Sequence, residues 1–364
     1  MLNLTLNGRN IQVTEGTSVL EAAQQAGVRI PTLCYHKDLS PHGGCRLCMV
    51  EVKGARNPLA SCTLQVSDGM EVQTDTPDLQ EARKLILELM LTNYYDAGYP
   101  ADALEKNELF EVAEELGLNP QDYLSSKQRF EINDDPNPFI WVDRNKCILC
   151  TRCVRACAEV QGRFVLGLVD RGFTNHIEAG SGRSFLDARC ESCGACAAYC
   201  PTGALTYKLS MSTGNHNHSI PTVCSYCGVG CSFNLEVNVK DNRVLRVSSN
   251  PNAPVNGMAL CVKGRFGYEY IHHHERLTKP LVREYLLNGT ERTAGEGRGA
   301  WVEVDWDTAM EITTRKLADA RDTWGADSVG ILTSAKLTNE ENYLVNKFAR
   351  QVIGTNSIDH CARL

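Results

Sequence analysis

Sixteen of the seventeen cysteines in this 364-residue chain fall into groups with short, repeated intervals. The first group comprises Cys34, Cys45, Cys48 and Cys62. Thiolates are the soft ligands that iron–sulfur clusters require, and a C-x-x-C pair lets two thiolates bind one iron. We therefore expect Cys45 and Cys48 to share an iron, beside the small residues Gly43 and Gly44, whose backbone N–H groups can approach the sulfurs. A structural zinc site would more often use two close C-x-x-C pairs.

Two further runs of cysteines both have the spacing C-x2-C-x2-C-x3-C and form an internal repeat. In two-cluster ferredoxins with this spacing, the fourth cysteine of each run binds the other cluster. Only the second run is followed by a proline, Pro201, whereas Ala158 takes that place in the first. The spacing predicts two [4Fe–4S] centres, one held by Cys147, Cys150, Cys153 and Cys200 and the other by Cys190, Cys193, Cys196 and Cys157.

A third group suits another [4Fe–4S] centre, although a structural zinc remains an alternative on spacing alone. Its members are Cys224, Cys227, Cys231 and Cys261. The remaining cysteine, Cys361, has no neighbouring cysteine, so we expect it to be a small buried hydrophobe rather than a ligand.

Composition narrows the class of protein. The net charge of −7 does not indicate a nucleic-acid partner. In a chain of this length, C-x-x-C runs indicate metal binding in a reducing compartment rather than disulfides. There is no signal peptide pattern and no apolar run of about 18 residues that would span a membrane. We expect a cytoplasmic protein that does not associate with membranes.

Residues 1–75 have the pattern of a small β-rich domain with one helix. Alternating apolar residues on both sides of Asn7-Gly8 predict a hairpin. Ser18 and Glu21 form a capping box at the start of the helix. Met49–Val52 and Met70–Val72 are expected to be further short strands.

Residues 76–140 are expected to be a helical spacer. Thr76-Pro77 begins a helix, and a second helix is expected from Asp102 to Leu116. We expect the first helix to bury an apolar stripe of Leu85, Ile86, Leu89 and Met90. Residues 141–209 hold the two repeated cysteine runs, residues 210–219 form a polar linker, and residues 220–275 hold the third group.

The sequence pattern of residues 276–364 is that of an α/β domain. Asp307 is expected to cap a helix through Trp324, and Val329–Leu332 to form a short buried strand. Thr338 and Glu341 form a capping box for a helix that ends at Gly354. A parallel sheet needs several such units to cover both faces, so this stretch is interpreted as the beginning of a domain.

The order of the cysteine groups resembles that of catalytic subunits of molybdenum- or tungsten-dependent formate dehydrogenases. Residues 1–75 resemble the [2Fe–2S] domain shared with complex I and iron-only hydrogenases, and the segment from Cys224 to Cys261 resembles the cluster domain of bis-pterin oxidoreductases. Three further segments resemble the start of the pterin-binding domain of that family: Pro280–Arg283, Gly330–Ser334 and Asn339–Tyr343.

The resemblance implies an α+β multidomain fold. Its parts are a β-grasp domain with one [2Fe–2S] cluster, a helical spacer, a bacterial ferredoxin fold with two [4Fe–4S] clusters, a small β-rich domain with a third, and the start of a pterin domain. It also implies a Mo- or W-bis(pterin guanine dinucleotide) in the whole enzyme. Lys263 matches the family lysine that relays electrons between the third [4Fe–4S] cluster and a pterin.

Asp359–Leu364 resembles the family segment just before a cysteine or selenocysteine that binds the metal. We therefore expect a selenocysteine enzyme whose sequence stops at a UGA codon, and a 364-residue chain that is inactive by itself. Many relatives carry in the spacer a further cluster that is bound by one histidine and three cysteines. Residues 63–146 contain neither Cys nor His, so that cluster is absent here.

The activity that the resemblance implies is the reversible oxidation of formate to CO2, a proton and two electrons. The electrons would pass to a partner such as a flavin-containing NAD subunit (a diaphorase), a ferredoxin or a hydrogenase subunit. A complete, non-catalytic electron-transfer subunit, an iron-only hydrogenase and another bis-pterin enzyme such as a nitrate reductase are the alternatives.

Overall fold

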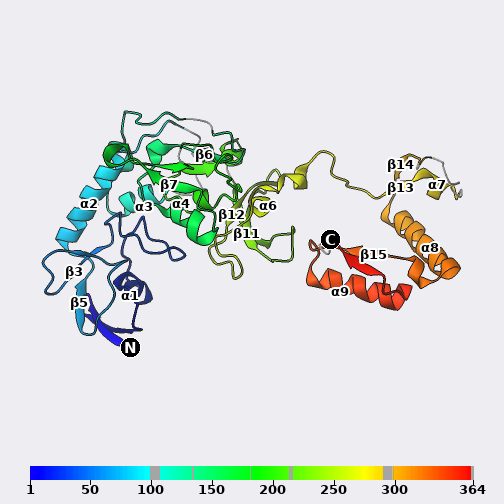
Figure 1. Cartoon of the computed structure of the whole chain (residues 1–364), viewed down its shortest axis with the longest axis horizontal. Helices are drawn as coiled ribbons and strands as arrows, with labels where there is room; N and C mark the ends of the chain where they lie inside the picture. Colours follow the sequence, from blue (N-terminus) through cyan, green and yellow to red (C-terminus); the bar gives the residue numbers. More distant parts are fainter. Residues whose placement is uncertain are drawn as a thin grey trace. The chain divides into compact units, whose positions relative to one another are not determined.

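The computed structural model describes residues 1–98, 107–132, 135–180, 182–212, 216–289, 297 and 299–361. The chain forms two compact units (Figure 1). The first unit comprises Met1–Pro221 and Phe233–Phe266, and the second comprises Thr222–Ser232 and Gly267–Leu364. This multidomain architecture of mixed α and β structure agrees with the fold class expected from the sequence.

The first unit begins with a five-stranded mixed sheet in the order β2-β1-β5-β3-β4. The hairpin of β1 and β2 turns at Asn7 and Gly8, both of which have positive φ as predicted for an Asn-Gly turn. Strand β5 pairs parallel to β1 and antiparallel to β3. The strands are β1 (Leu2–Leu6), β2 (Arg9–Val13), β3 (Met49–Val52), β4 (Leu59–Ala60) and β5 (Met70–Gln73).

Helix α1 (Val19–Gln25) covers the core side of this sheet. The capping box predicted for Ser18 and Glu21 is present, with the Ser18 side chain accepting from the Glu21 N–H. Val19, Leu20 and the buried strand residues form one apolar core. The core continues to Cys48 and Cys62, so this small domain holds two of its cysteines on its own hydrophobic interior.

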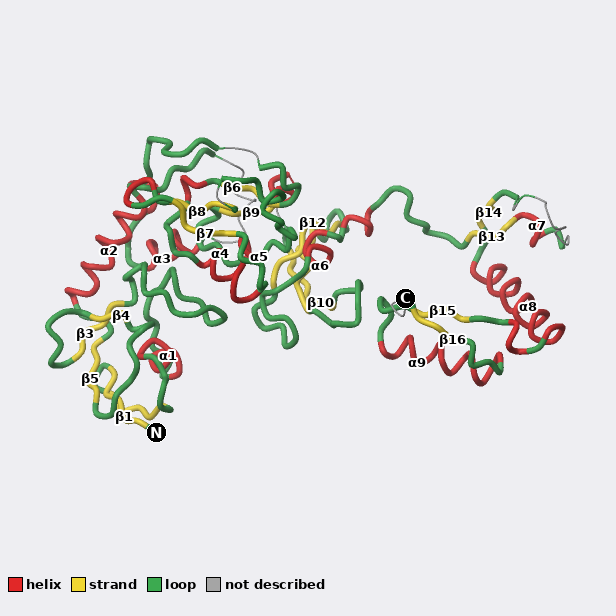
Figure 2. The backbone as a smooth tube through the Cα atoms, in the orientation of Figure 1, coloured by secondary structure: helices red, strands yellow, loops and turns green. Residues whose placement is uncertain are grey.

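Two helices follow the sheet. Helix α2 (Pro77–Leu91) starts at its predicted cap, Thr76, with Pro77 in the first turn. Helix α3 (Glu108–Glu115) begins after the N-cap Asn107. Of the predicted second helix, residues 102–106 lie outside the described residues. Figure 2 shows α2 as a long red helix that leads from the N-terminal sheet towards the part of the unit that contains β6.

The expected apolar stripe of α2 is confirmed only in part, since Ile86 and Met90 are half-buried against the core. Leu85 and Leu89 are exposed, and the helix instead buries Leu79, Arg83, Leu87 and Leu91. The sequence pattern excluded Arg83 because arginine is usually at the surface. Its guanidinium donates hydrogen bonds to the backbone carbonyls of Leu47, Met49 and Thr74, which satisfies its polar atoms in the interior.

The repeated cysteine runs lie in a compact ferredoxin-like part built from two short antiparallel pairs. The pair β6–β9 joins Ile140 to Tyr207, and the pair β7–β8 is a hairpin. Each run leads into a single turn of helix, α4 or α5. The elements are β6 (Ile140–Val142), α4 (Arg152–Arg155), β7 (Leu166–Val169), β8 (His176–Ala179), α5 (Ala195–Ala198) and β9 (Leu205–Tyr207).

A three-stranded sheet in the order β10-β11-β12 comes next along the chain. Strands β11 and β12 pair antiparallel with a bulge between Glu236 and Val237. The short helix α6 packs against β12 within the first unit. These elements are β10 (His218–Val223), β11 (Ser232–Asn238), β12 (Arg243–Ser249) and α6 (Val262–Phe266).

The second unit contains a β-hairpin, β13 (Leu281–Arg283) with β14 (Trp301–Glu303), and the single turn α7 (Glu284–Leu287). After α8 (Trp306–Trp324) comes a β-α-β passage made of β15 (Ile331–Thr333), α9 (Asn339–Phe348) and β16 (Ile358–His360). Strands β15 and β16 pair in parallel. The beginning of a parallel α/β domain, expected from the sequence, is therefore present.

Two details of this unit differ from expectation. Asp305, not Asp307, caps α8, because the Asp305 carboxylate accepts from the Thr308 N–H at 2.8 Å. The strand expected to be buried begins at Ile331, and Leu332 is 83% exposed. The capping box of Thr338 and Glu341 and the stop at Gly354 (φ +89°) are as predicted. None of the helices described here is long and apolar enough to cross a membrane.

Candidate metal centres

The first cysteine group is buried inside the N-terminal domain. Its four members, Cys34, Cys45, Cys48 and Cys62, are almost completely shielded from solvent. The sulfurs form two hydrogen-bonded pairs, Cys34 with Cys45 and Cys48 with Cys62. Which of these cysteines share an iron, expected to be Cys45 and Cys48, stays a prediction.

Within each pair, one thiol has a lower pKa than the other and so ionises more readily. The thiol of Cys45 donates to Cys34 and lowers the pKa of Cys34 to about 5. The thiol of Cys62 lowers the pKa of Cys48 to about 6 in the same way. The pKa values of the two donors, Cys45 and Cys62, are raised. A lowered pKa favours the thiolate, which is the form in which cysteine binds a metal.

The loop before Cys45 approaches the sulfurs closely, as the glycines suggested. The backbone N–H of Cys45 donates to the Cys34 sulfur at 3.4 Å, and the N–H of Gly44 also hydrogen-bonds to it. A side chain on Gly44 would come within 2.6 Å of the His42 ring. Gly43 has a φ of +69°. Gly43 therefore favours glycine because of its left-handed backbone, whereas the exposed His42 ring could turn away from a side chain on residue 44.

Four cysteines from the two repeated runs line one pocket in the ferredoxin-like part. They are the predicted set Cys147, Cys150, Cys153 and Cys200. The other lining residues are mainly apolar, among them Val142, Ile177 and Leu205. Four thiols gathered in a mainly apolar pocket fit an iron–sulfur cluster, which binds thiolates and is tuned by exclusion of water.

The second predicted set also comes together. The thiols of Cys190, Cys193 and Cys157 lie close enough to Cys196 to disfavour its ionisation. Burial, together with this mutual repulsion, raises the pKa of Cys190 to about 11 and that of Cys196 well above its usual range. The set that lines the pocket shows the same effect, since burial raises the pKa of its member Cys150 to about 12. Four thiolates in either place need a positive group to balance them.

The two runs also have the same backbone. Leu149 and Ser192, at matching positions, both have positive φ and both donate an N–H to the sulfur two residues earlier, at 3.4 and 3.3 Å. Thr151 and Gly194 occupy the next left-handed position in each run. This repetition confirms the internal repeat at the level of conformation. It directs N–H dipoles at the sulfurs of the first cysteine in each run, which stabilises negative sulfur.

The third cysteine group is divided between the two units. Cys224, Cys227 and Cys231 belong to the second unit, where the Cys224 N–H donates to the Cys231 carbonyl at 2.8 Å. Cys261 belongs to the first unit and precedes α6. A common site for these four cysteines remains a prediction. Lys263 lies on α6, where it is exposed, and its relay role likewise remains a prediction.

Cys361 is not the buried hydrophobe that was expected. It is exposed, and its thiol lies 3.4 Å from the Ser334 hydroxyl, a hydrogen bond that is the main cause of its lowered pKa. Among the described residues, no three Cys, His, Asp or Glu side chains are grouped as the ligands of one metal ion would be. The thiols of a polynuclear cluster bind different irons, so they surround a wider space.

Sequence reasoning missed the buried arginines near these cysteines. Arg152 and Arg155 are buried in α4, and Arg265 is buried in α6. Arginine is rarely buried without a partner, so a sequence gives no cue to such a position except its closeness to a ligand, here two residues before Cys157 and four after Cys261.

Comparison with known families covers nearly the whole chain. Residues 1–77 match the 2Fe-2S iron-sulfur cluster binding domain. Residues 137–206 match the NADH-quinone oxidoreductase subunit 3, ferredoxin-like domain. Residues 217–273 match the molybdopterin oxidoreductase Fe4S4 domain, and residues 276–364 match molybdopterin oxidoreductase. These matches follow the order of the cysteine groups.

Individual relatives share the same layout. The NADPH-Fe(3+) oxidoreductase subunit alpha of Geobacter sulfurreducens is 37% identical over 366 residues, which cover 100% of this chain and 40% of that protein. A provisionally named formate dehydrogenase of Staphylococcus aureus is 31% identical over 403 residues, 100% of this chain and 39% of that protein. The chain thus spans about two fifths of the length of these relatives.

A solved structure is similar to part of the chain. It is a chain of the NAD+-reducing [NiFe]-hydrogenase in the H2-reduced state, with 32% sequence identity and a TM-score of 0.50. The match covers 57% of this chain and 87% of the hydrogenase chain.

Proposed function

Because the chain belongs to the molybdopterin oxidoreductase family with iron–sulfur domains, we propose that it is the electron-transferring part of a formate dehydrogenase. In this proposal it carries one [2Fe–2S] and three [4Fe–4S] clusters on the sixteen grouped cysteines. The whole protein would add a Mo- or W-bis(pterin guanine dinucleotide) and convert formate to CO2, a proton and two electrons.

The observation that carries the electron-transfer role is the pocket lined by Cys147, Cys150, Cys153 and Cys200. Its fourth cysteine comes from the other run, which is the exchange that two-cluster ferredoxins use. Four thiols among mainly apolar lining residues suit iron–sulfur chemistry. A bound cluster supplies storage of one electron at a time.

Hydrogen bonds and burial around the ligand sulfurs influence how readily a bound cluster accepts an electron. The N–H groups of Leu149 and Ser192 point at ligand sulfurs, and hydrogen bonds of this kind stabilise the more negative, reduced state. Burial of Cys150, Cys153 and Cys196 excludes water. For Lys263 we propose the relay position between the Cys261 centre and a pterin, on the strength of the Cys261–Gly264 motif.

Formate as the substrate rests on sequence likeness. The supporting observations are the family segment at Asp359–Leu364 and the likeness to the Staphylococcus aureus protein. A second candidate is an NADPH- or NADH-oxidising complex in which this chain passes electrons from a flavin subunit. The 37% identity to the NADPH-Fe(3+) oxidoreductase subunit supports it. Both candidates place a redox partner subunit in the cytoplasm.

The cluster proposal is tested on the 364-residue chain purified without oxygen. We expect about 14 iron atoms per chain, two from the [2Fe–2S] and four from each [4Fe–4S] centre. Reduction should produce paramagnetic signals of both cluster types. Zinc in place of iron, or a chain without visible absorption, would reject the proposal.

The substrate proposal needs the whole protein with its partner. Formate-dependent dye reduction that persists when the partner is removed supports the formate dehydrogenase. Dye reduction that requires the partner and NADPH or NADH, with none from formate, establishes the second candidate instead.

A further inference from the structure

The buried arginines of the first unit differ in what balances their charge. Arg83 lies 3.9 Å from the Asp75 carboxylate, and Arg152 forms an ion pair with Glu108 at 2.9 Å. Arg155 and Arg265, 9% and 1% exposed, have no carboxylate within ion-pair distance among the described residues. Their guanidinium groups donate to uncharged oxygens only, so neither buried charge has a carboxylate partner in an ion pair, and the carboxylate of Glu159 interacts with Arg155 only at longer range.

Arg155 joins the first cysteine group to the ferredoxin-like part. Its Nη2 donates to the carbonyl of Cys34 at 2.5 Å and to the carbonyl of Cys150 at 3.1 Å. Its Nη1 donates to the Ser40 carbonyl, and its Nε to the Thr151 hydroxyl. One nitrogen therefore touches the backbone of a proposed [2Fe–2S] ligand and of a proposed [4Fe–4S] ligand.

Arg265 lies between another pair of cysteines, one contacted by its backbone and one by its side chain. Its backbone N–H donates to the carbonyl of Cys261 at 3.0 Å, and its Nε donates to the carbonyl of Cys193 at 2.8 Å. The rest of the guanidinium is held by the Tyr207 hydroxyl, the Ser249 hydroxyl and the Met258 carbonyl. Gly194 makes room for it, since a Cβ there would lie 2.3 Å from Arg265 Cδ.

A buried, unpaired guanidinium is strongly destabilising, and it persists where an anion offsets it. The cysteines bridged by these arginines belong to sets of four thiolates, which carry net negative charge around a bound cluster. A nearby positive charge favours the more negative, reduced state and so raises the reduction potential. Arg155 stands where it would act on two such sets, and the guanidinium of Arg265 where it would act on the set that includes Cys193.

We infer that Arg155 and Arg265 are positioning residues that fasten neighbouring cluster-ligand segments together and supply the positive charge that sets the reduction potentials there. The inference rests on the proposed clusters. Reduction adds one electron to a cluster and takes no proton from the arginine, because the guanidinium stays protonated. Arg155 thereby gives the [2Fe–2S] site a direct structural link to the Cys150 site without an intervening cluster in the spacer.

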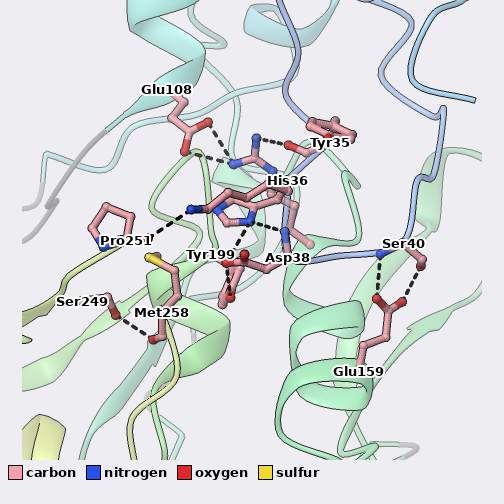
Figure 3. Close-up of polar contacts among 12 residues, drawn as sticks. Tyr35, His36, Asp38, Ser40, Glu108, Glu159, Tyr199, Ser249, Pro251 and Met258 are labelled. Carbon is pink, nitrogen blue, oxygen red and sulfur yellow. Dashed lines mark hydrogen bonds and ion pairs between the residues drawn. The ribbon is translucent and has the colours of Figure 1, made fainter. Parts of the chain in front are cut away.

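Other contacts keep the loop of residues 34–40 in place when Arg155 is changed, as Figure 3 shows. Glu159 accepts from the backbone and the hydroxyl of Ser40, at 2.8 and 2.5 Å. The Tyr199 hydroxyl donates to Asp38 at 3.1 Å, and the Tyr35 carbonyl accepts from Arg152 at 2.7 Å. A variant at Arg155 should therefore fold and load iron.

The experiment compares the variants Arg155→Gln, Arg155→Lys and Arg265→Gln in the anaerobically purified chain. Potentials of the individual centres are measured by redox titration monitored by paramagnetic resonance, beside iron content and melting temperature. Arg29→Gln is the matched control, because Arg29 pairs with Glu115 at the surface. Arg155→Gln should make reduction of the [2Fe–2S] centre and one [4Fe–4S] centre about tenfold less favourable, a shift of about 59 mV.

Arg155→Lys should keep both potentials near those of the wild type, because it keeps the charge. Arg265→Gln should lower the potential of the other ferredoxin-like centre and spare the [2Fe–2S] centre. Unchanged potentials in loaded Arg155→Gln, or an equal shift in Arg29→Gln, would overturn the inference. If Arg155→Gln loads no iron, a tenfold shift in Arg155→Lys overturns the charge argument. A wild-type chain without clusters refutes the proposed function instead.

Discussion

Arg152 and Glu108 form an ion pair in which one guanidinium nitrogen donates to both carboxylate oxygens, at 3.0 and 2.9 Å. The pair connects the cysteine run of the ferredoxin-like part to α3 of the spacer. A second guanidinium nitrogen, Nη2, donates to the Tyr35 carbonyl, beside Cys34. One side chain thus ties together all three parts that surround the first two cluster sites.

Breaking this pair should destabilise the chain. The Arg152 side chain is buried while that of Glu108 is 31% exposed, so we expect Glu108→Gln to cost about 2 kcal/mol, less than the loss of a fully buried pair. Arg152→Gln should cost more, because it also removes the bond to Tyr35. Chemical denaturation of both variants and of the double variant measures the coupling. Strictly additive costs would contradict an energetic pairing.

The exchange of cysteines between the two runs makes a prediction about single substitutions. Cys200→Ser should damage the centre held by Cys147, Cys150 and Cys153, although Cys200 lies in the second run. Iron content should fall and one of the two [4Fe–4S] signals should change. Cys361→Ser, at the exposed cysteine, is the control and should leave every signal intact. Loss of the other ferredoxin-like centre in Cys200→Ser would show that the runs are not crossed.

Gly194 and Gly162 provide a matched test of the space that Arg265 fills. Both have positive φ, +73° and +64°, but only Gly194 faces atoms that a Cβ would strike. Gly162→Ala should cost about 1 kcal/mol for the left-handed backbone. Gly194→Ala should cost about 3 kcal/mol, since it must also displace Arg265. Melting temperatures of the two variants report the difference, and equal values would mean that Arg265 moves aside freely.

The buried face of α2 can be tested with two leucines. Leu87 is completely buried and Leu89 is 58% exposed. Leu87→Ala should lower the free energy of unfolding by about 2–5 kcal/mol. Leu89→Ala should change it by less than about 0.5 kcal/mol. The opposite ranking would restore the apolar stripe that the sequence pattern suggested.

Local signals in the sequence were sufficient for several elements. The Asn7-Gly8 turn, the capping boxes at Ser18 and Thr338 and the start of α2 at Pro77 are set by side chains within a few residues, so pattern alone predicts them. The crossed cysteine sets follow because ligand spacing is a direct consequence of cluster geometry.

What the sequence could not predict depends on distant partners. Leu87 and Leu89 are both leucines two residues apart, but only Leu87 is buried by side chains from elsewhere in the chain. The burial of Arg83 depends on carbonyls at Leu47 and Met49, far along the chain. The pairing of the first two cysteines, Cys34 with Cys45, requires the fold of the intervening loop. None of these contacts produces a periodic pattern in the sequence from which it could be predicted.

One apolar cluster contains side chains from three segments: Cys34 and Cys45 near the start of the chain, Leu87, Tyr94 and Leu109 in the spacer, and Cys150 in the ferredoxin-like part. Because a continuous interior cannot be opened in one place without exposing the rest, these segments form a single cooperative unit. Heating should therefore melt them together, with the spacer joining its two neighbours through this shared apolar interior.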